Sequence, residues 1–197
     1  MINLTIDGQQ VKAFEGQTIL EAARGREGVG KIPTLCHSFI QSHLRAAKPC
    51  RVCVVELTEG EKTRYPFACM TPVKEGMVVN TNTDEVQKRR KEAVERLLQI
   101  SSVQRLLDLA EEVGVDTSKL TLGEDECIVC GMCERACKDP RGPGTSAISL
   151  VKTDSVSYYE VSDDCFGCGD CVTACPLGTA DIREKAIIPK PKAAQAA

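Results

Sequence analysis

The stretch Cys127-Ile-Val-Cys130-Gly-Met-Cys133-Glu-Arg-Ala-Cys137 is repeated further along the chain as Cys165-Phe-Gly-Cys168-Gly-Asp-Cys171-Val-Thr-Ala-Cys175. Both stretches have the spacing C-x2-C-x2-C-x3-C, and Pro176 follows the second. Gly131 and Gly169 occupy the same place in the two copies, where a residue without a Cβ lets the backbone approach a bound group or take a positive φ. Ala136 and Ala174 also match, and a small residue there leaves room beside the cysteines. This internal repeat predicts a pseudo-twofold domain over residues 119–184.

The spacing of these two runs is typical of proteins that bind two [4Fe–4S] clusters through cysteine thiolates. In such proteins the last cysteine of each run ligates the cluster of the other run. The first predicted [4Fe–4S] site therefore consists of Cys127, Cys130, Cys133 and Cys175. The second consists of Cys165, Cys168, Cys171 and Cys137. A zinc site is the alternative, but zinc ribbons use two separated C-x2–4-C pairs, which this tight run does not resemble.

A third group of four cysteines lies nearer the N-terminus and predicts a [2Fe–2S] site: Cys36, Cys50, Cys53 and Cys69. Its spacing departs from the plant-type C-x4-C-x2-C pattern. Each outer cysteine could alternatively be a buried apolar residue, as free cysteine often is. A Rieske centre would need two histidine ligands. Four cysteines are already present, so we expect His37 and His43 to be ordinary loop residues.

The composition excludes several other classes of protein. The chain has 197 residues, a formal net charge of −3, 4% aromatic residues and no tryptophan. It therefore offers no basic face for nucleic acid. The N-terminus lacks the basic and apolar regions of a secretory signal, and no apolar run is long enough to span a bilayer. Clustered C-x2-C pairs without an export signal favour metal or redox chemistry over a disulfide scaffold. We expect a soluble, cytoplasmic protein.

Residues 1–82 predict a small β-grasp ferredoxin-like domain. Alternating apolar residues from Ile2 to Ile6 indicate a strand, Asp7-Gly8 a tight turn, and Val11 the second strand of a hairpin. A short helix is expected over Ile19–Arg24, with Thr18 as its N-cap. Further strands are expected over residues 52–57, 65–68 and 77–79.

Residues 83–118 predict a helical linker. Apolar residues recur close to one face of the first helix, and the basic run 88–91 is expected to be a solvated face. Ser101-Ser102 can cap a second helix that Gly114 ends. Residues 185–197 are expected to be a flexible tail or a strap along a partner. The predicted fold class is α+β, with an N-terminal [2Fe–2S] domain, a helical linker and a C-terminal bacterial-type 2[4Fe–4S] domain.

The sequence shows no feature that predicts a substrate site. No proton-transfer dyad, nucleophile triad, Walker loop or dinucleotide-binding GxGxxG fingerprint stands out. We therefore expect the chain to carry electrons without an active site of its own.

The order of these segments resembles the iron–sulfur subunit shared by respiratory NADH dehydrogenase, NAD-reducing hydrogenases and electron-bifurcating hydrogenases. The resemblance rests on Pro33-Thr-Leu-Cys36, Cys50-Arg-Val-Cys53-Val-Val-Glu56, Ala68-Cys69-Met-Thr-Pro72, Gly76-Met77, the Arg89-Arg90 helix and both later cysteine runs. It implies one [2Fe–2S] and two [4Fe–4S] clusters. It also implies an FMN- and NAD(H)-binding flavoprotein partner and a catalytic partner, such as a hydrogenase or formate dehydrogenase subunit, with soluble ferredoxin as a further partner.

The chain departs from this family in one place. Members usually carry a further [4Fe–4S] site with one histidine and three cysteine ligands, but here no cysteine lies between Cys69 and Cys127. No molybdopterin or hydrogen-activating domain is expected after Ala197. These features favour a trimmed relay subunit of a soluble, modular NAD(P)-linked oxidoreductase, in which electron bifurcation is one option. The alternatives are a freestanding polyferredoxin and the iron–sulfur subunit of succinate dehydrogenase or fumarate reductase, whose cysteine spacing fits poorly.

Overall fold

The computed structural model describes residues 1–37, 40–182 and 186–195, and the chain divides into two compact units. The first unit consists of Met1–Thr34, Arg51–Val94 and Glu112–Gly114. The second consists of Leu35–Cys50, Glu95–Glu111 and Val115–Ala197. The segment Leu35–Cys50 therefore groups with the second unit, although it precedes most of the first unit's sheet in sequence.

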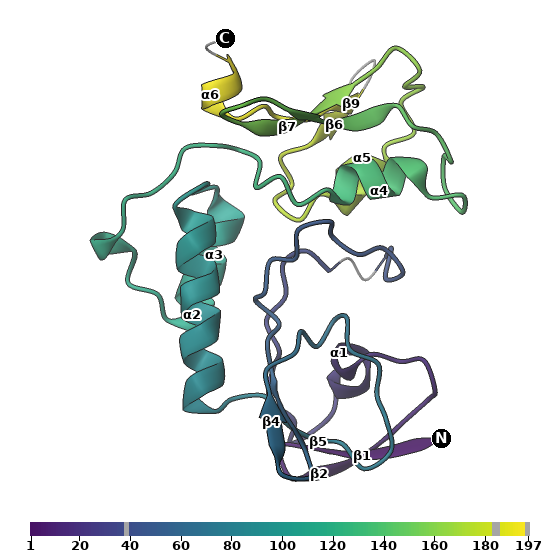
Figure 1. Ribbon diagram of the computed structural model, residues 1–197, viewed down its shortest axis with the longest axis vertical. Helices are drawn as coiled ribbons and strands as arrows, with labels where there is room; N and C mark the ends of the chain where they lie inside the picture. The colour runs from purple at the N-terminus through teal and green to yellow at the C-terminus, as the bar shows by residue number, and fades with distance from the viewer. Residues whose placement is uncertain (38–39, 183–185, 196–197) are drawn as a thin grey trace. The chain divides into compact units, whose positions relative to one another are not determined.

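The first unit is built on a five-stranded sheet with the order β2-β1-β5-β3-β4 (Figure 1). Its strands are β1 (Ile2–Ile6), β2 (Gln9–Ala13), β3 (Glu56–Glu59), β4 (Lys62–Arg64) and β5 (Val78–Asn80). The predicted hairpin is present: β1 and β2 pair antiparallel around Asp7 and Gly8, which both have positive φ. β5 joins β1 in parallel and β3 antiparallel, which makes the sheet mixed.

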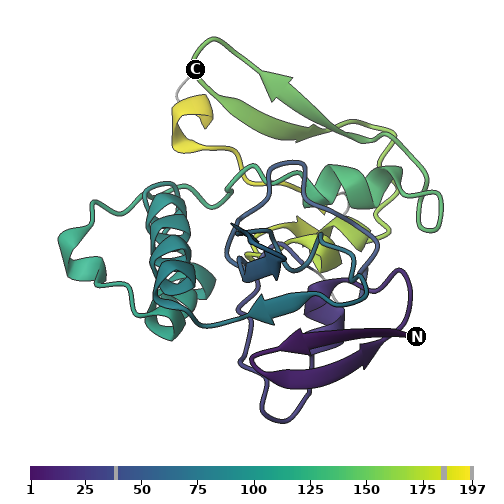
Figure 2. The same cartoon turned by 60° about the horizontal axis from the view of Figure 1, so that its bottom comes forward.

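Helix α1 (Ile19–Ala23) packs its apolar residues into the core beneath this sheet, and Figure 2 shows it beside the β1–β2 hairpin. Thr18 is its N-cap, as predicted. The Thr18 hydroxyl accepts from the Glu21 N–H, and the Glu21 carboxylate accepts from the Thr18 N–H, which completes a capping box. Ile19 and Leu20 are buried with Leu4 and Ile6. The helix is short, so this burial and its cap hold it in place.

Of the remaining strand predictions in this unit, one is right only in part and one is wrong. Only Glu56 and Leu57 of the run 52–57 lie in β3, because residues 52 and 53 form a turn and Val54 makes only an isolated bridge to Phe67. Residues 65–68 form no regular strand, because β4 ends at Arg64. The two segments are joined by two backbone hydrogen bonds. The Ala68 N–H donates to the Cys53 carbonyl over 2.9 Å, and the Val55 N–H donates to the Pro66 carbonyl over 3.0 Å. The hydrophobic run that suggests a strand therefore forms a buried loop around Cys53.

Two helices follow the sheet: α2 (Asp84–Leu98) and α3 (Gln104–Val113), with a short 3-10 turn at η1 (Thr117–Lys119). Gly114 ends α3 with φ 73°, as expected of a glycine C-terminal to a helix. The predicted Ser101-Ser102 cap is not formed, because α3 begins at Gln104 and the Ser102 hydroxyl donates to the Gly123 carbonyl over 2.8 Å. The basic run 88–91 is not wholly solvated either, since Arg90 is only 5% exposed.

The second unit contains the internal repeat. Its elements are α4 (Met132–Lys138), the hairpin β6 (Ile148–Lys152) and β7 (Ser157–Val161), α5 (Asp170–Ala174), the small pair β8 (Asp181–Ile182) and β9 (Ala186–Ile187), and α6 (Lys192–Gln195). Each cysteine run thus leads into a short helix and is followed by a two-stranded antiparallel pair. The core of this unit includes cysteines from both runs, together with Ile148 and Tyr159.

The C-terminal residues differ from the predicted flexible tail. Ala186 and Ile187 form β9, and Ile188 is buried. The Lys192 N–H donates to the Asp125 carboxylate over 2.7 Å, and the Lys192 ammonium contacts Glu124. These contacts attach residues 186–195 to the segment that precedes Cys127.

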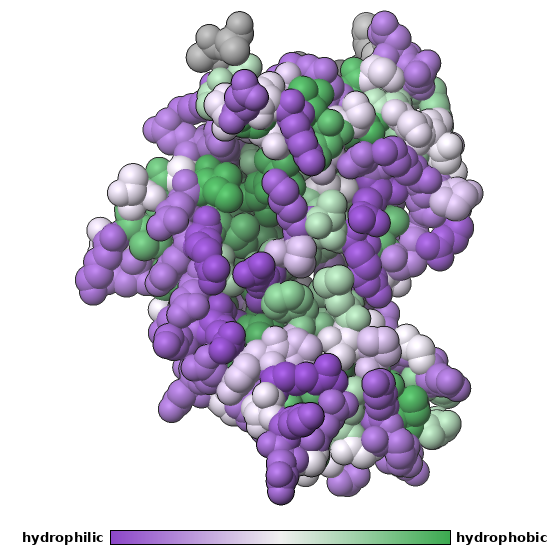
Figure 3. All heavy atoms as spheres, in the orientation of Figure 1, coloured by the Kyte–Doolittle hydropathy of each residue, from purple (hydrophilic) through white to green (hydrophobic). Residues whose placement is uncertain are grey.

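These elements confirm the predicted α+β class. Within the part of the chain that the structure describes, no helix is both long and apolar enough to cross a membrane. The face drawn in Figure 3 carries mostly hydrophilic side chains, with hydrophobic residues gathered in smaller areas between them.

Candidate iron–sulfur sites

All twelve cysteines lie among the described residues, and all are thiols. Eight are buried and three are half-buried, whereas Cys168 is exposed. Thiolate is the soft ligand that iron–sulfur clusters use, so this donor set suits such a group. Among the described side chains, no three His, Cys, Asp or Glu residues converge on a single metal ion. In a cluster the thiolates bind different iron atoms.

The backbone of the two C-x2-C-x2-C loops has the same shape in both copies. Val129 and Gly167, which each precede the second cysteine of a run, have φ values of 51° and 77°. Gly131 and Gly169 are the N-caps of α4 and α5 and also adopt the left-handed conformation, with φ values of 80° and 85°. The Val129 N–H donates to the Cys127 sulfur over 3.3 Å. These turns direct backbone N–H groups toward the cysteines, where they can stabilise negative charge.

The first predicted [4Fe–4S] ligand set is close enough for its thiols to interact. Burial raises the pKa of Cys130 to about 12, and Cys127, Cys175 and Cys50 contribute in the same direction. Burial likewise raises the pKa of Cys133, with contributions from Cys130, Cys127 and Cys175. Cys175 comes from the other run, so the mutual effects among these thiols link it to the first loop.

The second predicted [4Fe–4S] ligand set lines one small cavity. Cys137 lies on this cavity's wall together with Cys165, Cys168 and Cys171. Burial raises the pKa of the Cys171 thiol to about 11, with a further contribution from Cys168. The Cys165 sulfur accepts a hydrogen bond from the Ala186 N–H over 3.5 Å, and the Cys137 sulfur lies 3.1 Å from the Thr145 hydroxyl. Hydrogen bonds to cluster sulfurs are one means of setting a reduction potential.

The predicted [2Fe–2S] ligands are divided between the units. Cys53 and Cys69 belong to the first unit, where their sulfurs are 3.3 Å apart and buried. Cys36 and Cys50 are also buried but belong to the second unit. Arg51, which follows Cys50, has φ 65°, so this C-x2-C pair also contains a residue in the left-handed region. Within the first unit, the structure thus brings two of the four predicted ligands, Cys53 and Cys69, together.

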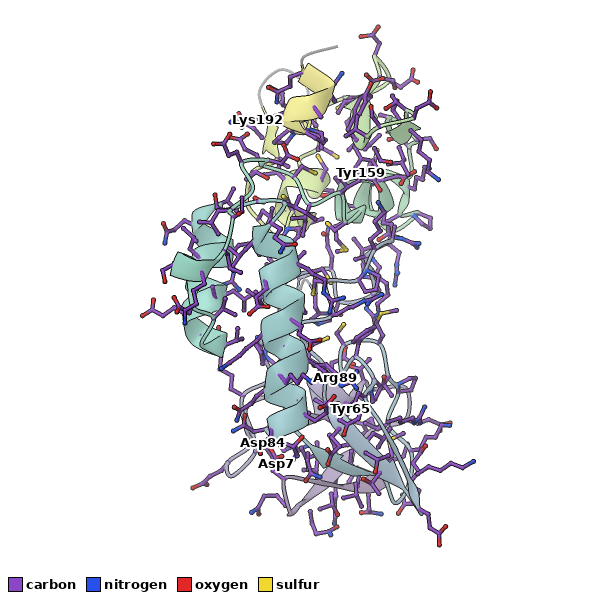
Figure 4. The ribbon with its side chains drawn as sticks, turned by 60° about the vertical axis from the view of Figure 1, so that its left-hand side comes forward. Asp7, Tyr65, Asp84, Arg89, Tyr159 and Lys192 are labelled. Carbon is purple, nitrogen blue, oxygen red and sulfur yellow. The ribbon has the colours of Figure 1, made fainter. Side chains whose placement is uncertain are left out.

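A buried cation lies beside Cys53 in the first unit. The Arg90 Nη2 donates to the Val54 carbonyl over 2.9 Å. Burial lowers the pKa of the Arg90 guanidinium, whereas the charges of Cys53, Asp7 and Glu112 raise it. The preceding residue behaves differently: Arg89 is exposed, pairs with Glu85 and stacks over the Tyr65 ring, 4.3 Å from its centroid (Figure 4).

Sequence reasoning missed three residues at these sites. Val129 has a left-handed backbone that its β-branched side chain disfavours, and only its alignment with Gly167 could have revealed it. The basic run 88–91 predicts a solvated Arg90, but Arg90 is buried. The sequence predicts an ordinary loop residue at His43, but the His43 Nε2 contacts the Asp139 carboxylate. His37 is buried.

Family models match most of the chain in two separate parts. Residues 1–84 match a 2Fe-2S iron-sulfur cluster binding domain, and residues 121–182 match a 4Fe-4S dicluster domain. The first part contains the Cys36–Cys69 set, and the second contains both later runs.

Several characterised relatives share nearly the whole chain. It is 33% identical to the NADP-reducing hydrogenase subunit HndD of Solidesulfovibrio fructosivorans over 90% of its length and 35% of that protein's. It is 29% identical to an NADH-quinone oxidoreductase subunit of Rhizobium meliloti, over 90% of this chain and 24% of the relative. It is 30% identical to the NADPH-Fe(3+) oxidoreductase subunit alpha of Geobacter sulfurreducens, over 91% of this chain and 24% of the relative. The chain thus spans about a quarter to a third of the length of these relatives.

A solved structure has the same fold. The crystal structure of an NAD+-reducing [NiFe]-hydrogenase in the H2-reduced state superposes with a TM-score of 0.62 at 24% identity, over 81% of this chain and 74% of the other. The predicted resemblance to the iron–sulfur subunits of NADH dehydrogenases and NAD(P)-linked hydrogenases is confirmed.

Proposed function

We propose that this chain, an iron–sulfur protein that joins a 2Fe-2S cluster binding domain to a 4Fe-4S dicluster domain, is the electron-relay subunit of a multisubunit NAD(P)-linked oxidoreductase. It would pass electrons between a flavin- and NAD(P)-binding subunit and a catalytic subunit. The observation that carries the proposal is the presence of three complete cysteine sets in a chain that is similar over nearly its whole length to subunits of such oxidoreductases.

The proposed ligands follow the crossed pattern. Cys127, Cys130 and Cys133 would hold one [4Fe–4S] cluster with Cys175, which is supported by the mutual effects of these thiols on their pKa values. The cavity lined by Cys137 and the second run supports the other [4Fe–4S] site, whose ligands would be Cys165, Cys168, Cys171 and Cys137. This crossing would join the two halves of the repeat covalently through the clusters.

The [2Fe–2S] site is proposed from the four N-terminal cysteines: Cys36, Cys50, Cys53 and Cys69. It is supported by the close Cys53–Cys69 pair and by the match of residues 1–84 to a 2Fe-2S domain. One [2Fe–2S] and two [4Fe–4S] clusters would give the chain three redox centres.

The chain's own residues hold the clusters and control their surroundings. When bound, iron–sulfur clusters supply one-electron transfer. The thiols bind iron as thiolates, so cluster assembly must displace the protons that burial retains on Cys130 and Cys171. The N–H groups in both loops then supply partial positive charge to the thiolates. Burial of most of the cysteines limits access of water and oxygen to the iron.

The partner subunits supply the chemistry at the ends of the relay. A flavin-containing subunit would exchange two electrons with NAD(P)H and pass them on singly. The catalytic partner would be a hydrogenase subunit, in keeping with the similarity to HndD, or a formate dehydrogenase subunit. Electron bifurcation with soluble ferredoxin is part of this proposal as a further option for the same complex.

Affinity purification under anaerobic conditions tests the relay role. A tagged chain expressed in its native cell should co-purify with a flavoprotein, and NADH or NADPH added to this complex should bleach the iron–sulfur absorbance. A cluster-loaded chain that purifies alone, with no flavoprotein bound, would instead be a freestanding polyferredoxin.

A further inference from the structure

A pocket of about 460 Å³ opens beside α4 in the second unit. One wall is the loop of residues 43–47, and the other is α4 with the residues that follow it, up to Arg141. The loop is fixed in place: the Lys48 N–H donates to the Cys130 carbonyl over 3.1 Å, and Leu44 is buried. The pocket is therefore a built feature of the unit, separate from the cysteine sites.

The charges that line this pocket are mainly positive. Arg45, Arg135, Lys138 and Arg141 contribute four positive charges, against the two carboxylates of Glu134 and Asp139. The chain as a whole has a net charge of −3, so this pocket has the opposite sign. A local concentration of one charge in a concave surface focuses the electrostatic potential and attracts ligands of the other sign.

Part of this positive charge is not neutralised within the pocket. Lys138 pairs with Glu134 over 2.6 Å, and the Arg141 Nε lies 3.4 Å from the Asp139 carboxylate, which also contacts His43. Arg45 donates to the carbonyls of Ser42 and Leu44, which carry no net charge. Arg135 is exposed and makes no ion pair with any residue that the structure describes. The two arginines are therefore available for carboxylate or phosphate oxygens, which guanidinium groups bind in pairs.

The position of the pocket connects it to electron transfer. α4 directs Cys133 and Cys137, which are proposed ligands of the two different [4Fe–4S] clusters, into the core. The same helix presents Arg135 and Lys138 to the pocket. A molecule seated there is thus separated from both ligands by roughly the width of one helix, about 10 Å. That proximity would serve a redox partner.

We propose that this pocket docks the carboxylates of a small acidic electron-carrier protein, which exchanges electrons with the clusters across α4. The proposal rests on the relay function proposed above and identifies one of its partners. The mixture of charges favours a protein over a compact polyanion. Separated carboxylates can interleave with Glu134 and Asp139, whereas the phosphates of a nucleotide would be repelled by them, and the described lining contains no Phe, Tyr or Trp on which a base could stack.

Binding and electron transfer can be measured separately on the full, cluster-loaded chain. The probe is a small acidic 2[4Fe–4S] ferredoxin: calorimetry measures the affinity of its oxidised form, and stopped-flow absorbance measures electron transfer from its reduced form. We expect Arg135→Glu and Arg45→Glu each to weaken binding and slow association by about tenfold at low salt. Rising ionic strength should slow the wild-type reaction and affect the variants much less.

Lys152→Glu is the matched control, because it makes the same charge change at an exposed residue of β6 that does not line the pocket. It should leave both measurements within about twofold of wild type, because a charge remote from the docking site is screened by salt. Reduced methyl viologen should reduce all variants at least as fast as the wild-type chain. Wild-type kinetics that do not depend on salt, or equal effects of Lys152→Glu and Arg135→Glu, would overturn the proposal.

Two further results keep the outcomes distinct. Tight binding of pyrophosphate that Arg135→Glu abolishes, with no effect on ferredoxin, would identify a small-anion site and overturn docking. Iron content and EPR spectra of each variant report whether the clusters are present. If the wild-type chain held no clusters, the relay function would fail, but binding of oxidised ferredoxin would still test the docking surface. If an Arg→Glu variant lost its clusters, docking would be tested with Arg135→Gln and with the salt dependence of the wild-type reaction. Weaker binding by Arg135→Gln and slower wild-type transfer at high salt would support docking, and the absence of both effects would overturn it.

Discussion

The buried guanidinium of Arg90 donates to the Val54 carbonyl over 2.9 Å, one residue beyond the proposed cluster ligand Cys53. A fixed positive charge in a low-dielectric interior favours the more negative, reduced state of a nearby cluster. Arg90→Gln removes this charge, so we expect a more negative midpoint potential for the [2Fe–2S] signal in an EPR-monitored redox titration. Arg90→Lys should retain most of the wild-type value.

Arg89→Gln provides the control for this prediction. It removes the same charge from the adjacent position, but Arg89 is exposed and its field is screened by water. The potential of this variant should equal that of wild type. Equal potentials for wild type and Arg90→Gln would show that Arg90 has only a structural role at Val54. In that case Arg90→Met should still destabilise the unit by about 1–3 kcal/mol, because the Val54 carbonyl is left buried without its donor.

The strained backbone at Val129 predicts an unusual tolerance of glycine. A β-branched residue in the left-handed region costs about 1–2 kcal/mol, and glycine removes this cost. Val129→Gly should therefore lower stability by less than about 1 kcal/mol, since relief of strain offsets the lost side-chain packing. The comparison is Val161→Gly, which removes a valine packed against the same core from a regular strand. We expect it to cost about 2 kcal/mol or more.

Thermal midpoints measured anaerobically at one scan rate give this comparison for the cluster-loaded chain. Equal decreases in thermal midpoint for Val129→Gly and Val161→Gly would contradict the claim that the backbone at Val129 is strained. The Val129→Gly variant should also keep the iron content of wild type, because the equivalent loop in the second run already has Gly167 at this position.

A methyl group at Gly131 has no space. A Cβ there would lie 2.7 Å from the Tyr159 hydroxyl and 2.8 Å from the Ala47 Cβ, in addition to the φ of 80°. Gly178 has a similar φ of 69° but nothing within 4 Å of the added Cβ. Gly131→Ala should cost about 3 kcal/mol, and Gly178→Ala about 1 kcal/mol, since only the first combines backbone strain with overpacking. Thermal midpoints of the two variants test this; a Gly178→Ala loss as large as that of Gly131→Ala would refute the close contact.

Acid should weaken the hydrogen bonds between Glu75 and Asn3 in the first unit. The Glu75 carboxylate accepts from the Asn3 N–H over 2.8 Å and from the Asn3 amide over 3.0 Å, and these bonds lower the pKa of Glu75 below 4.5. A group with a lowered folded-state pKa stabilises the fold above its unfolded value, and this contribution is lost as the pH falls through the folded value. Wild type should unfold at a higher temperature than Glu75→Gln at pH 7, and the difference should shrink below about pH 4.5.

Glu61→Gln is the comparison for the acid experiment, because Glu61 is an exposed glutamate in the same unit. Its midpoint should follow that of wild type at every pH. If the difference in unfolding temperature between wild type and Glu75→Gln stayed constant down to about pH 3, ionisation of the Glu75 carboxyl group would make no contribution to stability.

Much of the fold could be predicted because local rules and tertiary packing agree. The alternation from Ile2 to Ile6, the Asp7-Gly8 turn and the Thr18 cap each act through near neighbours, and all three predictions are confirmed. The run of residues 52–57 has the β-branched composition of a strand, but only Glu56 and Leu57 lie in β3, and residues 52–55 form a buried loop that contains Cys53. Tertiary packing overrides the strand propensity there.

Tertiary contacts explain the other errors. Arg90 has the sequence context of a solvated charge, and only the loop folded against α2 makes it a buried donor. Ser102 has the chemistry of a cap but bonds to Gly123, which is distant in sequence. The residues after Ala186 have the composition of a flexible tail, yet Asp125 and Glu124 provide partners for Lys192. The cysteine repeat was readable from sequence, whereas the pocket beside α4 required the fold, because its walls are far apart along the chain.

The cluster content of the wild-type chain tests the central claim most directly. Iron and acid-labile sulfide are measured on anaerobically purified protein, together with EPR spectra of the reduced form. One [2Fe–2S] and two [4Fe–4S] clusters predict about ten irons per chain and signals from both cluster types. Stoichiometric zinc, or cysteines oxidised to disulfides without iron, would contradict the account.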